Sequence, residues 1–358
     1  MGSAAAGSGG LKSVATATAP PKTARKKLVK RAPPDRSQSL RRAFQLGFLA
    51  LNVWIGVEFC LFVRYYETGG RSVYASRPAG VEGWLPIASL MNLKVLLLTG
   101  RTPTIHAAGM FLLLAFLAMS WLFRKSFCGW LCPVGTVSEY LWRIGRLRLR
   151  LPRALDIGLR SLKYLLLGLF LYAVVSMPVA AIRAFLEGPY GLVDDVKMLN
   201  FFRFLGLSGG IVLALLVVAS VLIRNFWCRY LCPYGALMGL VSSLSPVRIR
   251  REDSLCIDCG KCARACPALL PVDQLVSIRS AECTACLECV AACPAAGALA
   301  LTAPVVKRRV PAWLVAAGIA MLFLGAYATA RWTGHWNTNL SKTTYFELIP
   351  HANEFQHP

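Results

Sequence analysis

Charged residues are scarce in this sequence, and acidic ones are the scarcest. Charged side chains make up 16% of the 358 residues, with 17 acidic against 40 basic, whereas a soluble domain carries about a quarter. Hydrophobic residues reach 56%. This composition excludes an ordinary soluble domain and favours a membrane protein, in which Lys and Arg collect in cytoplasmic loops.

Several common motifs are also missing. No C-x-x-C-H occurs, which excludes covalent attachment of c-type haem. The G-x-G-x-x-G and Walker patterns are absent, which argues against a nucleotide site. A net charge of +23 is compatible with nucleic-acid binding, but no basic–aromatic recognition motif accompanies it. We therefore expect no nucleic-acid partner, and membrane lipid explains the basic excess better.

The first 42 residues lack any apolar periodicity. They are rich in Ala, Gly, Ser, Pro, Lys and Arg, which predicts a disordered basic tail. No apolar stretch follows a short basic start before residue 43, so we expect no cleaved signal peptide.

Five stretches are long and apolar enough for a spanning helix, which needs about 20 residues. They are residues 43–63, 104–123, 162–182, 206–224 and 311–330. A further apolar stretch, 84–100, is interrupted by Pro86, Asn92 and Lys94. We expect it to be an interfacial or re-entrant segment.

Basic residues predict the orientation. The N-terminal tail holds ten Lys and Arg, the loop 124–160 holds eight and the loop 224–309 holds eleven. The opposite side holds five in 64–101, three in 183–203 and two after 330. With five spans, the N-terminus and both Cys-rich loops are then cytoplasmic, and the C-terminal tail is outside.

Two runs of cysteines between Cys256 and Pro294 follow the pattern C-x2-C-x2-C-x3-C-P, the spacing of a bacterial ferredoxin with two [4Fe–4S] clusters. The fourth cysteine of each run ligates the other cluster. The predicted ligands are therefore Cys256, Cys259, Cys262 and Cys293 for one cluster, and Cys283, Cys286, Cys289 and Cys266 for the other. Zinc knuckles are the alternative, but tandem runs with a trailing proline favour clusters. Their thiolates need a reducing compartment, in agreement with the cytoplasmic placement.

A second pattern, C-x3-C-P, occurs twice at an offset of 100 residues, in RKSFCGWLCPVG from Arg124 and RNFWCRYLCPYG from Arg224. Both copies follow a span that enters the cytoplasm, which predicts a parallel repeat that brings the two pairs near one another. We take these cysteines as candidate catalytic residues: Cys128, Cys132, Cys228 and Cys232. A third redox centre, a transiently bound metal and a thiol/disulfide pair are open alternatives, and simple packing is the fourth.

Polar residues on the predicted outer side suggest a quinone site. A quinone needs hydrogen-bond partners for two ring oxygens and a proton route. The candidates are His106, Glu58, Glu187, Asp194 and Asp195. They form no recognised motif, and Glu58 has an alternative role as an interfacial partner of Arg64.

The chain resembles the NapH/NosR-type membrane iron–sulfur proteins. The resemblance runs from about residue 43 to the end and includes RPAGVEGWLPI (77–87), FCGWLCPVG, WCRYLCPYG and TGHWN (333–337). It implies electron transfer between the quinone pool and periplasmic reductase or maturation systems. It also implies that the eight ferredoxin cysteines are cluster ligands and that the C-x3-C-P cysteines are redox or partner-contact residues.

A related group, the CcoG-type cytochrome oxidase accessory proteins, shares both cysteine patterns and is linked to copper reduction. NosR-like members carry an additional flavin-bearing domain and CcoG-type members a larger outer domain, whereas the predicted outer tail of this chain has only 28 residues.

Together these features predict an α-helical polytopic membrane protein of about five spans, with an inserted cytoplasmic α+β ferredoxin domain of the bacterial 2[4Fe–4S] type, in a bacterial inner membrane. The predicted parts are a tail (1–42), a four-span domain (43–247), the ferredoxin domain (248–303), a fifth span (304–330) and an external tail (331–358).

The predicted function is one-electron transfer that links quinone or a cytoplasmic donor to a further redox partner. Such a chain would serve as a quinol dehydrogenase-like oxidoreductase component. Two other hypotheses stay open: a metallocofactor assembly factor such as a copper reductase, and a membrane redox sensor.

Overall fold

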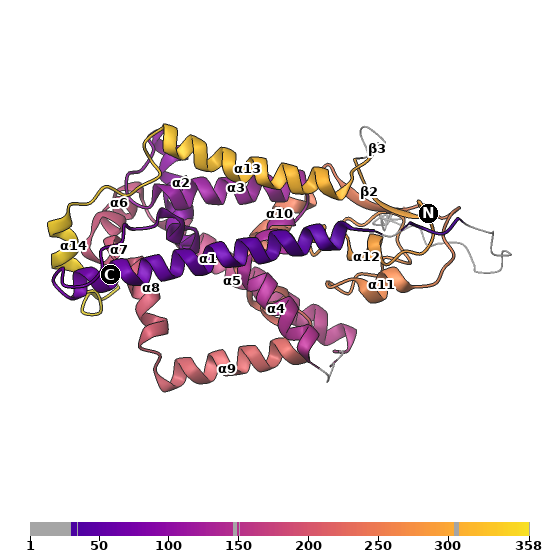
Figure 1. Cartoon of the computed structure of the whole chain (residues 1–358), viewed down its shortest axis with the longest axis horizontal. Coiled ribbons are helices and arrows are strands. Elements are labelled where there is room, and N and C mark those ends of the chain that lie inside the picture. The colour runs from indigo at the N-terminus through magenta and orange to yellow at the C-terminus, as the bar shows by residue number, and fades with distance from the viewer. Residues whose placement is uncertain (1–29, 34, 146–148, 150, 304–307, 358) are drawn as a thin grey trace, which may run out of the picture.

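The molecule is elongated, with a small Cys-rich domain at one end of a bundle of helices (Figure 1). The computed structural model describes residues 30–33, 35–145, 149, 151–303 and 308–357. Most of the predicted tail and the start of the predicted fifth span, residues 304–307, lie outside the described residues. The C-terminal helix lies at the end opposite the Cys-rich domain.

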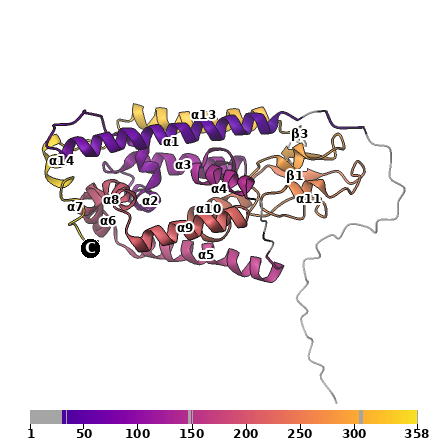
Figure 2. The same ribbon diagram turned by 60° about the horizontal axis from the view of Figure 1, so that its bottom comes forward.

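Within the described residues, three helices are long and apolar enough to cross a membrane. They are α1 (Ser37–Glu67), α5 (Arg153–Ser176) and α13 (Ala312–Trp332). Large apolar side chains on them are exposed, among them Trp54, Leu165 and Met321, as expected of helices that face lipid. Helices α1 and α13 lie side by side along the bundle with α3 beneath them (Figure 2).

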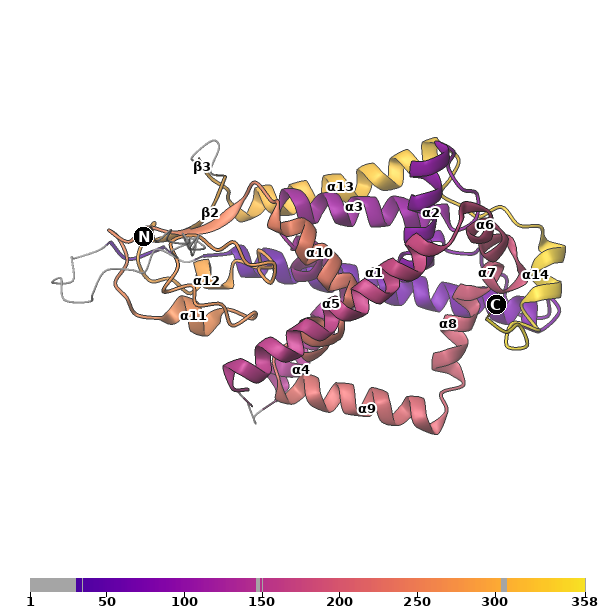
Figure 3. The ribbon, with the colours of Figure 1, turned by 180° about the vertical axis from the view of Figure 1, so that it is seen from behind.

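Shorter helices lie between these three along the chain. Among them are α2 (Pro86–Thr99), α3 (Ala107–Leu122), α8 (Asp194–Arg203) and α9 (Leu207–Leu222). Helices α3 and α9 have 16 residues each, fewer than the predicted spans. Helices α8 and α9 together have the composition of one span but meet at 82°. Helix α2 runs steeply across α3 (Figure 3).

The beginning of α1 corrects one prediction. The helix starts at Ser37, whereas the predicted tail extends to residue 42. The side chain of Asp35 accepts a hydrogen bond from the Ser37 amide at 2.6 Å, which satisfies a backbone donor that a helix start leaves free. Residues 37–42 are therefore helical.

The two C-x3-C-P segments have the same architecture. In the first, α3 leads through a π-helical turn into α4; in the second, α9 does so into α10. The added elements are η2 (Phe127–Leu131), α4 (Pro133–Ile144), η3 (Trp227–Leu231) and α10 (Pro233–Ser243). The copies pack reciprocally, α4 on α9 and α10 on α3. Helix α1 contacts η2, and helix α5 contacts η3.

The Cys-rich domain contains a three-stranded antiparallel sheet in the order β1-β2-β3 and two short helices. These elements are β1 (Arg248–Arg251), α11 (Lys261–Ala265), α12 (Glu288–Ala291), β2 (Leu299–Ala303) and β3 (Arg308–Arg309). In register, Arg248 pairs with Thr302 and Arg251 with Leu299. Strand β3 lies beyond the predicted boundary at residue 303.

The N-terminal segment also joins this domain. Arg31 forms an antiparallel bridge with Ala295, and the Ala32 amide donates to the Pro294 carbonyl at 2.8 Å. The far end of the bundle is closed by η1 (Ala79–Trp84), α6 (Val179–Glu187), α7 (Pro189–Leu192) and α14 (Lys342–Leu348).

Candidate functional site

Each C-x3-C-P motif folds into a π-helical turn. The amide of Cys132 donates to the carbonyl of Phe127 at 2.9 Å, and that of Cys232 donates to Trp227 at 3.0 Å. A hydrogen bond between residues five positions apart defines a π turn. This element is rare overall, but it occurs often at functional sites. The turn breaks the regular spacing of a helix and turns the cysteines out of the helix that precedes them.

The second cysteine of each motif caps the helix that follows. The Sγ of Cys132 accepts the amide of Gly135 at 3.5 Å, and the Sγ of Cys232 accepts that of Gly235 at 3.2 Å. The intervening proline is the first residue of α4 and α10, a position where its missing N–H costs no hydrogen bond. The motif therefore holds its cysteines at a rigid joint between two helices.

The four C-x3-C-P cysteines, the C-x3-C-P set, lie close enough to affect one another's ionisation. Burial raises the pKa of Cys128 to about 12 and that of Cys132 to about 11, and neighbouring thiols of the set add to both shifts. Burial also raises the pKa of Cys228. Without a bound metal, these three are neutral thiols at pH 7. A metal would displace their protons on binding.

A buried lysine accompanies this set. Lys125 is 3% exposed. Burial acts to lower its pKa, but Cys128, Glu282 and the second-copy cysteines outweigh that effect and raise it. Asn225 occupies the corresponding position in the second copy, so only the first copy brings an ammonium group to the cysteines.

The cysteines of the Cys-rich domain fall into two groups around two cavities. Four partly exposed cysteines line one cavity, and we call them the exposed set: Cys256, Cys259, Cys262 and Cys293. Four cysteines that are between 6% and 9% exposed line the other cavity, and we call them the buried set: Cys266, Cys283, Cys286 and Cys289. These are the two groups that the spacing predicts. Four cysteines at each cavity match the donor set of a [4Fe–4S] cluster.

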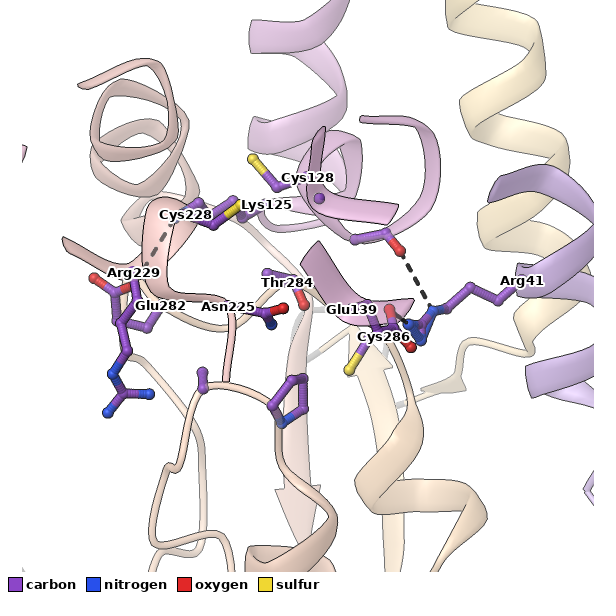
Figure 4. Close-up of a pocket in the computed structure, with 14 residues that line it drawn as sticks. Arg41, Lys125, Cys128, Glu139, Asn225, Cys228, Arg229, Glu282, Thr284 and Cys286 are labelled. Carbon is purple, nitrogen blue, oxygen red and sulfur yellow. Dashed lines mark hydrogen bonds and ion pairs between the residues drawn. The ribbon is translucent and has the colours of Figure 1, made fainter. Parts of the chain in front are cut away.

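A third cavity lies between the buried set and the C-x3-C-P set. Its lining includes Cys128, Cys228, Lys125 and Cys286. Figure 4 shows Lys125, Cys128 and Cys228 close together, with Cys286 on the other side. Pro267, which follows the buried Cys266, lines it too. Among the residues that the structure describes, no three His, Cys, Asp or Glu side chains are arranged to hold a single metal ion.

The far end of the molecule contains a buried ionic network. Arg77 contacts Glu82 at 2.7 Å and Asp195 at 2.7 Å, and His106 lies 3.5 Å from Glu82. Ion pairing with Arg77 and hydrogen bonding to His106 overcome the effect of burial and lower the pKa of Glu82 to about 2. Arg77, Glu82, Asp195 and His106 therefore form one connected group of buried charges.

This network includes some of the residues suggested for a quinone site and leaves out others. The Nε2 of His106 lies 3.1 Å from Asp194. Glu58 is elsewhere and accepts a hydrogen bond from Ser76, and Glu187 lines a separate cavity with Asn92. Sequence reasoning did not single out Arg77 and Glu82, although both lie within the RPAGVEGWLPI segment.

Two family descriptions match the chain. A "4Fe-4S binding domain" matches residues 105–152 and again 205–252, and a "4Fe-4S dicluster domain" matches residues 248–294. The first pair of matches covers the two C-x3-C-P copies, and the third covers both cysteine runs. No solved structure matches the chain.

Curated relatives agree with these matches. YccM of Escherichia coli, named as a candidate electron transport protein, is 48% identical over 88% of this chain and 91% of its own length. NirI of Paracoccus denitrificans is 32% identical over 64% of this chain and 34% of its own. The ferredoxin-type protein NapH of Haemophilus influenzae is 31% identical over 40% of this chain and 47% of its own.

These similarities confirm the resemblance drawn from the sequence. The iron–sulfur domains and the apolar helices occur together in relatives named for electron transport or as ferredoxins. The chain belongs to the family of ferredoxin-type membrane electron transport proteins that includes YccM.

Proposed function

We propose that the chain carries single electrons through three sets of cysteines, and that the C-x3-C-P set holds a third iron–sulfur centre. The observation that supports this most directly is the cavity that touches Cys128, Cys228 and Cys286. Clusters bound to the three sets supply one-electron carriers, whose potentials depend on hydrogen bonding and exposure. The buried set lies between the other two, which gives the order exposed set, buried set, C-x3-C-P set.

The residues around the third set suit a negatively charged centre. Four thiolates are a large concentration of negative charge, and the ammonium of Lys125 offsets part of it. The amides of Gly135 and Gly235 donate to the sulfurs of Cys132 and Cys232, and hydrogen bonds to ligand sulfurs stabilise the more negative state. In this proposal Cys128 and Cys228 face the buried set.

We also propose that the protein lies in a bacterial inner membrane with its Cys-rich domain and N-terminus in the cytoplasm. The Cys-rich domain and the first described residues, 30–33, lie at one end of the bundle and α14 lies at the other, which agrees with the distribution of Lys and Arg. In this arrangement α1, α3, α5, α9 and α13 are the five crossings. The proposed domain boundaries are those that the sequence predicts, except that α1 starts at Ser37 and β3 extends the Cys-rich domain to Arg309.

The redox partners follow from the geometry of this path. The exposed set is the entry or exit for a soluble partner. A quinone that exchanges electrons with the C-x3-C-P set would bind at the cytoplasmic end, because His106 is separated from that set by α3. At 1.5 Å per residue, the 16 residues of α3 span about 24 Å. We therefore do not place the quinone beside His106.

A second candidate function is metal handling by the C-x3-C-P set. Clustered thiols are preferred ligands of Cu(I), and two cysteines of this set, Cys128 and Cys228, line one cavity. As an assembly factor the protein would bind copper at Cys128 and Cys228, while the clusters supplied electrons.

An iron count on protein purified without oxygen tests the proposal. Three [4Fe–4S] centres require about twelve irons per chain, and two require about eight. We expect about twelve, and we expect the double variant Cys128→Ser/Cys228→Ser to fall to about eight with the remaining EPR signals intact. Cys60→Ser is the matched control, because Cys60 belongs to no motif and is exposed.

A count of about eight irons in the unchanged protein would contradict the third centre. If that protein instead binds copper and the double variant does not, the metal-handling function is favoured. For a purely sensory protein, no steady electron flux from a soluble donor to a membrane acceptor would be measurable.

A further inference from the structure

The second cysteine run carries two glutamates that the first run lacks. Glu282 directly precedes Cys283, and Glu288 directly precedes Cys289. At the corresponding positions the first run has Leu255 and Lys261. The two runs have identical cysteine spacing, so these glutamates distinguish the run that supplies three of the four buried cysteines.

Glu282 is held by the helical bundle. Its Oε1 lies 2.6 Å from the Nζ of Lys163 and accepts a hydrogen bond from the hydroxyl of Tyr164 at 3.2 Å. Its Oε2 lies 3.8 Å from the Nζ of Lys125. The Lys163 side chain is fully buried. Glu282 therefore joins the first C-x3-C-P copy to α5.

Glu288 makes the corresponding contacts on the other side. Its Oε1 lies 3.1 Å from the Nη1 of Arg41, and its Oε2 lies 2.7 Å from the Nη2 of Arg224. Arg41 belongs to α1, and Arg224 precedes the π turn of the second C-x3-C-P copy. Each glutamate thus pairs with a cation from a C-x3-C-P copy and a cation from a long helix, α5 for Glu282 and α1 for Glu288. Glu288 also lies 4.0 Å from Arg143 of α4.

Backbone contacts fix the loop between the two glutamates. The indole of Trp130 donates to the Ala285 carbonyl at 3.0 Å, and the amide of Gln38 donates to the Cys286 carbonyl at 2.9 Å. Arg124 donates to the Ser280 carbonyl. Gly129 is required at its position, because a Cβ there would come within 2.7 Å of the Thr284 carbonyl. The loop therefore has little freedom to move away from the bundle.

We propose that Glu282 and Glu288 are positioning residues that dock the buried set against the C-x3-C-P set. Two carboxylates at opposite ends of one loop fix both its distance from the bundle and its rotation. Because buried cations left without partners are unfavourable, the loop is held in one orientation. The idea that this docking supports electron transfer rests on the proposed function, whereas the docking itself does not.

The experiment uses the full-length, cluster-loaded protein in lipid nanodiscs under anaerobic conditions. A water-soluble iron chelator should remove iron in a fast phase from the exposed set and in a slow phase from the buried centres. Glu282→Gln/Glu288→Gln keeps the shape of both side chains and removes their charge. We expect its slow phase to accelerate about tenfold or more, the scale of a lost buried ion pair, with the fast phase unchanged.

Two further variants control this result. Lys261→Gln changes the corresponding position of the first run and should leave the slow phase unchanged. Glu288→Arg/Arg224→Glu exchanges the charges of one pair, and we expect it to release iron more slowly than Glu288→Arg alone. A double glutamine variant with an unchanged slow phase, or a charge exchange without rescue, overturns the proposal.

The chelation experiment tests the docking by the two glutamates, and a second measurement tests the proposed electron-transfer path. Magnetic coupling between the buried and C-x3-C-P centres, seen as broadening in EPR, reports on their distance and should weaken in the double glutamine variant. If the iron count shows no third centre, the coupling is absent in every variant and the proposed path fails, while the chelation result still decides the docking.

Discussion

The two cysteine runs share one spacing but lie in different surroundings. Between its first three cysteines the first run has Ile-Asp and Gly-Lys, and its Asp258 and Lys261 are exposed. The second run has Thr-Ala and Leu-Glu, and its Ala285 and Leu287 are buried. The same ligand pattern can therefore serve contact with a soluble partner in one run and an internal step in the other, and the intervening residues decide which.

Backbone conformation shows the same contrast. Asp258 and Gly260 have positive φ in the first run, as do Ala285 and Leu287 in the second. Glycine adopts this conformation freely and Asp tolerates it, whereas Ala and Leu adopt it at a cost of about 1–2 kcal/mol. In the second run that cost is offset by packing, because Leu287 lies in the main hydrophobic core.

The largest expected difference between the runs concerns their cysteines. Cys256→Ser and Cys286→Ser should each lower the iron content by about four per chain. Only Cys286→Ser should also expose the loop 280–288 to protease, because it empties a cavity inside the docked interface. Iron analysis with limited proteolysis and mass spectrometry measures both effects. Equal cleavage in the two variants would mean that the runs do not differ in docking.

A substitution outside both cysteine runs tests whether the effects on the buried set are local. Glu82 lies at the far end, and its pKa of about 2 compares with an ordinary value of 4.5. A lowered pKa stabilises the fold above pH 4.5, and this contribution, about 3 kcal/mol, is lost as the pH falls toward 2. Glu82→Gln should therefore lower the thermal midpoint at pH 7 and less so near pH 4.

The iron-release phases should be the same in Glu82→Gln and in the unchanged protein at pH 7. A faster slow phase in this variant would show that loosening any part of the bundle affects the buried set. The contrast between the runs would then lose its local explanation.

The corresponding aromatic residues of the two C-x3-C-P copies give a smaller effect. Trp130→Phe removes the N–H that donates to the Ala285 carbonyl, and an unsatisfied buried carbonyl costs about 1–3 kcal/mol. It should speed iron loss from the buried set. Tyr230→Phe removes a hydroxyl that donates to Asp156 at 2.6 Å. It should lower thermal stability but leave the iron-release phases unchanged, since its partner lies in α5.

The smallest expected effect is that of Ala285→Gly, which changes backbone strain without removing a large side chain. Ala285→Gly relieves a positive φ but also frees the unfolded chain, so the net change in unfolding free energy should stay within about 1 kcal/mol. The same substitution at Leu287 loses a buried side chain and should cost about 2–5 kcal/mol. Thermal unfolding of both variants measures the difference. Similar losses would mean that packing does not offset the strain at Leu287.

The spacing of the cysteines predicts how they group in the structure. Cysteine spacing alone separates Cys256 and Cys293 from Cys266 and Cys286, since the crossing of the fourth ligand belongs to the motif. The repeat at 100 residues is visible because Pro133 and Pro233 must each start a helix after a break. These features depend on residues close together in the chain.

Contacts between distant residues escape this kind of prediction. Glu282 and Lys163 are 119 residues apart, and nothing near either one indicates its partner. The lengths of α3 and α9 were also overestimated, because apolar composition continues to the point where the backbone turns. Arg124 and Asn225 adopt positive φ there, and hydropathy does not register that change.

The bridge between Arg31 and Ala295 has a consequence for biosynthesis. The two strands that it joins are separated by 264 residues of chain, so Arg31 has left the ribosome well before its partner is made. At 5–20 residues per second, that delay is about 13 to 50 seconds. Arg31 therefore stays without this partner while the helical bundle is made, and the bridge forms only after the second cysteine run, which ends at Cys293, has been synthesised.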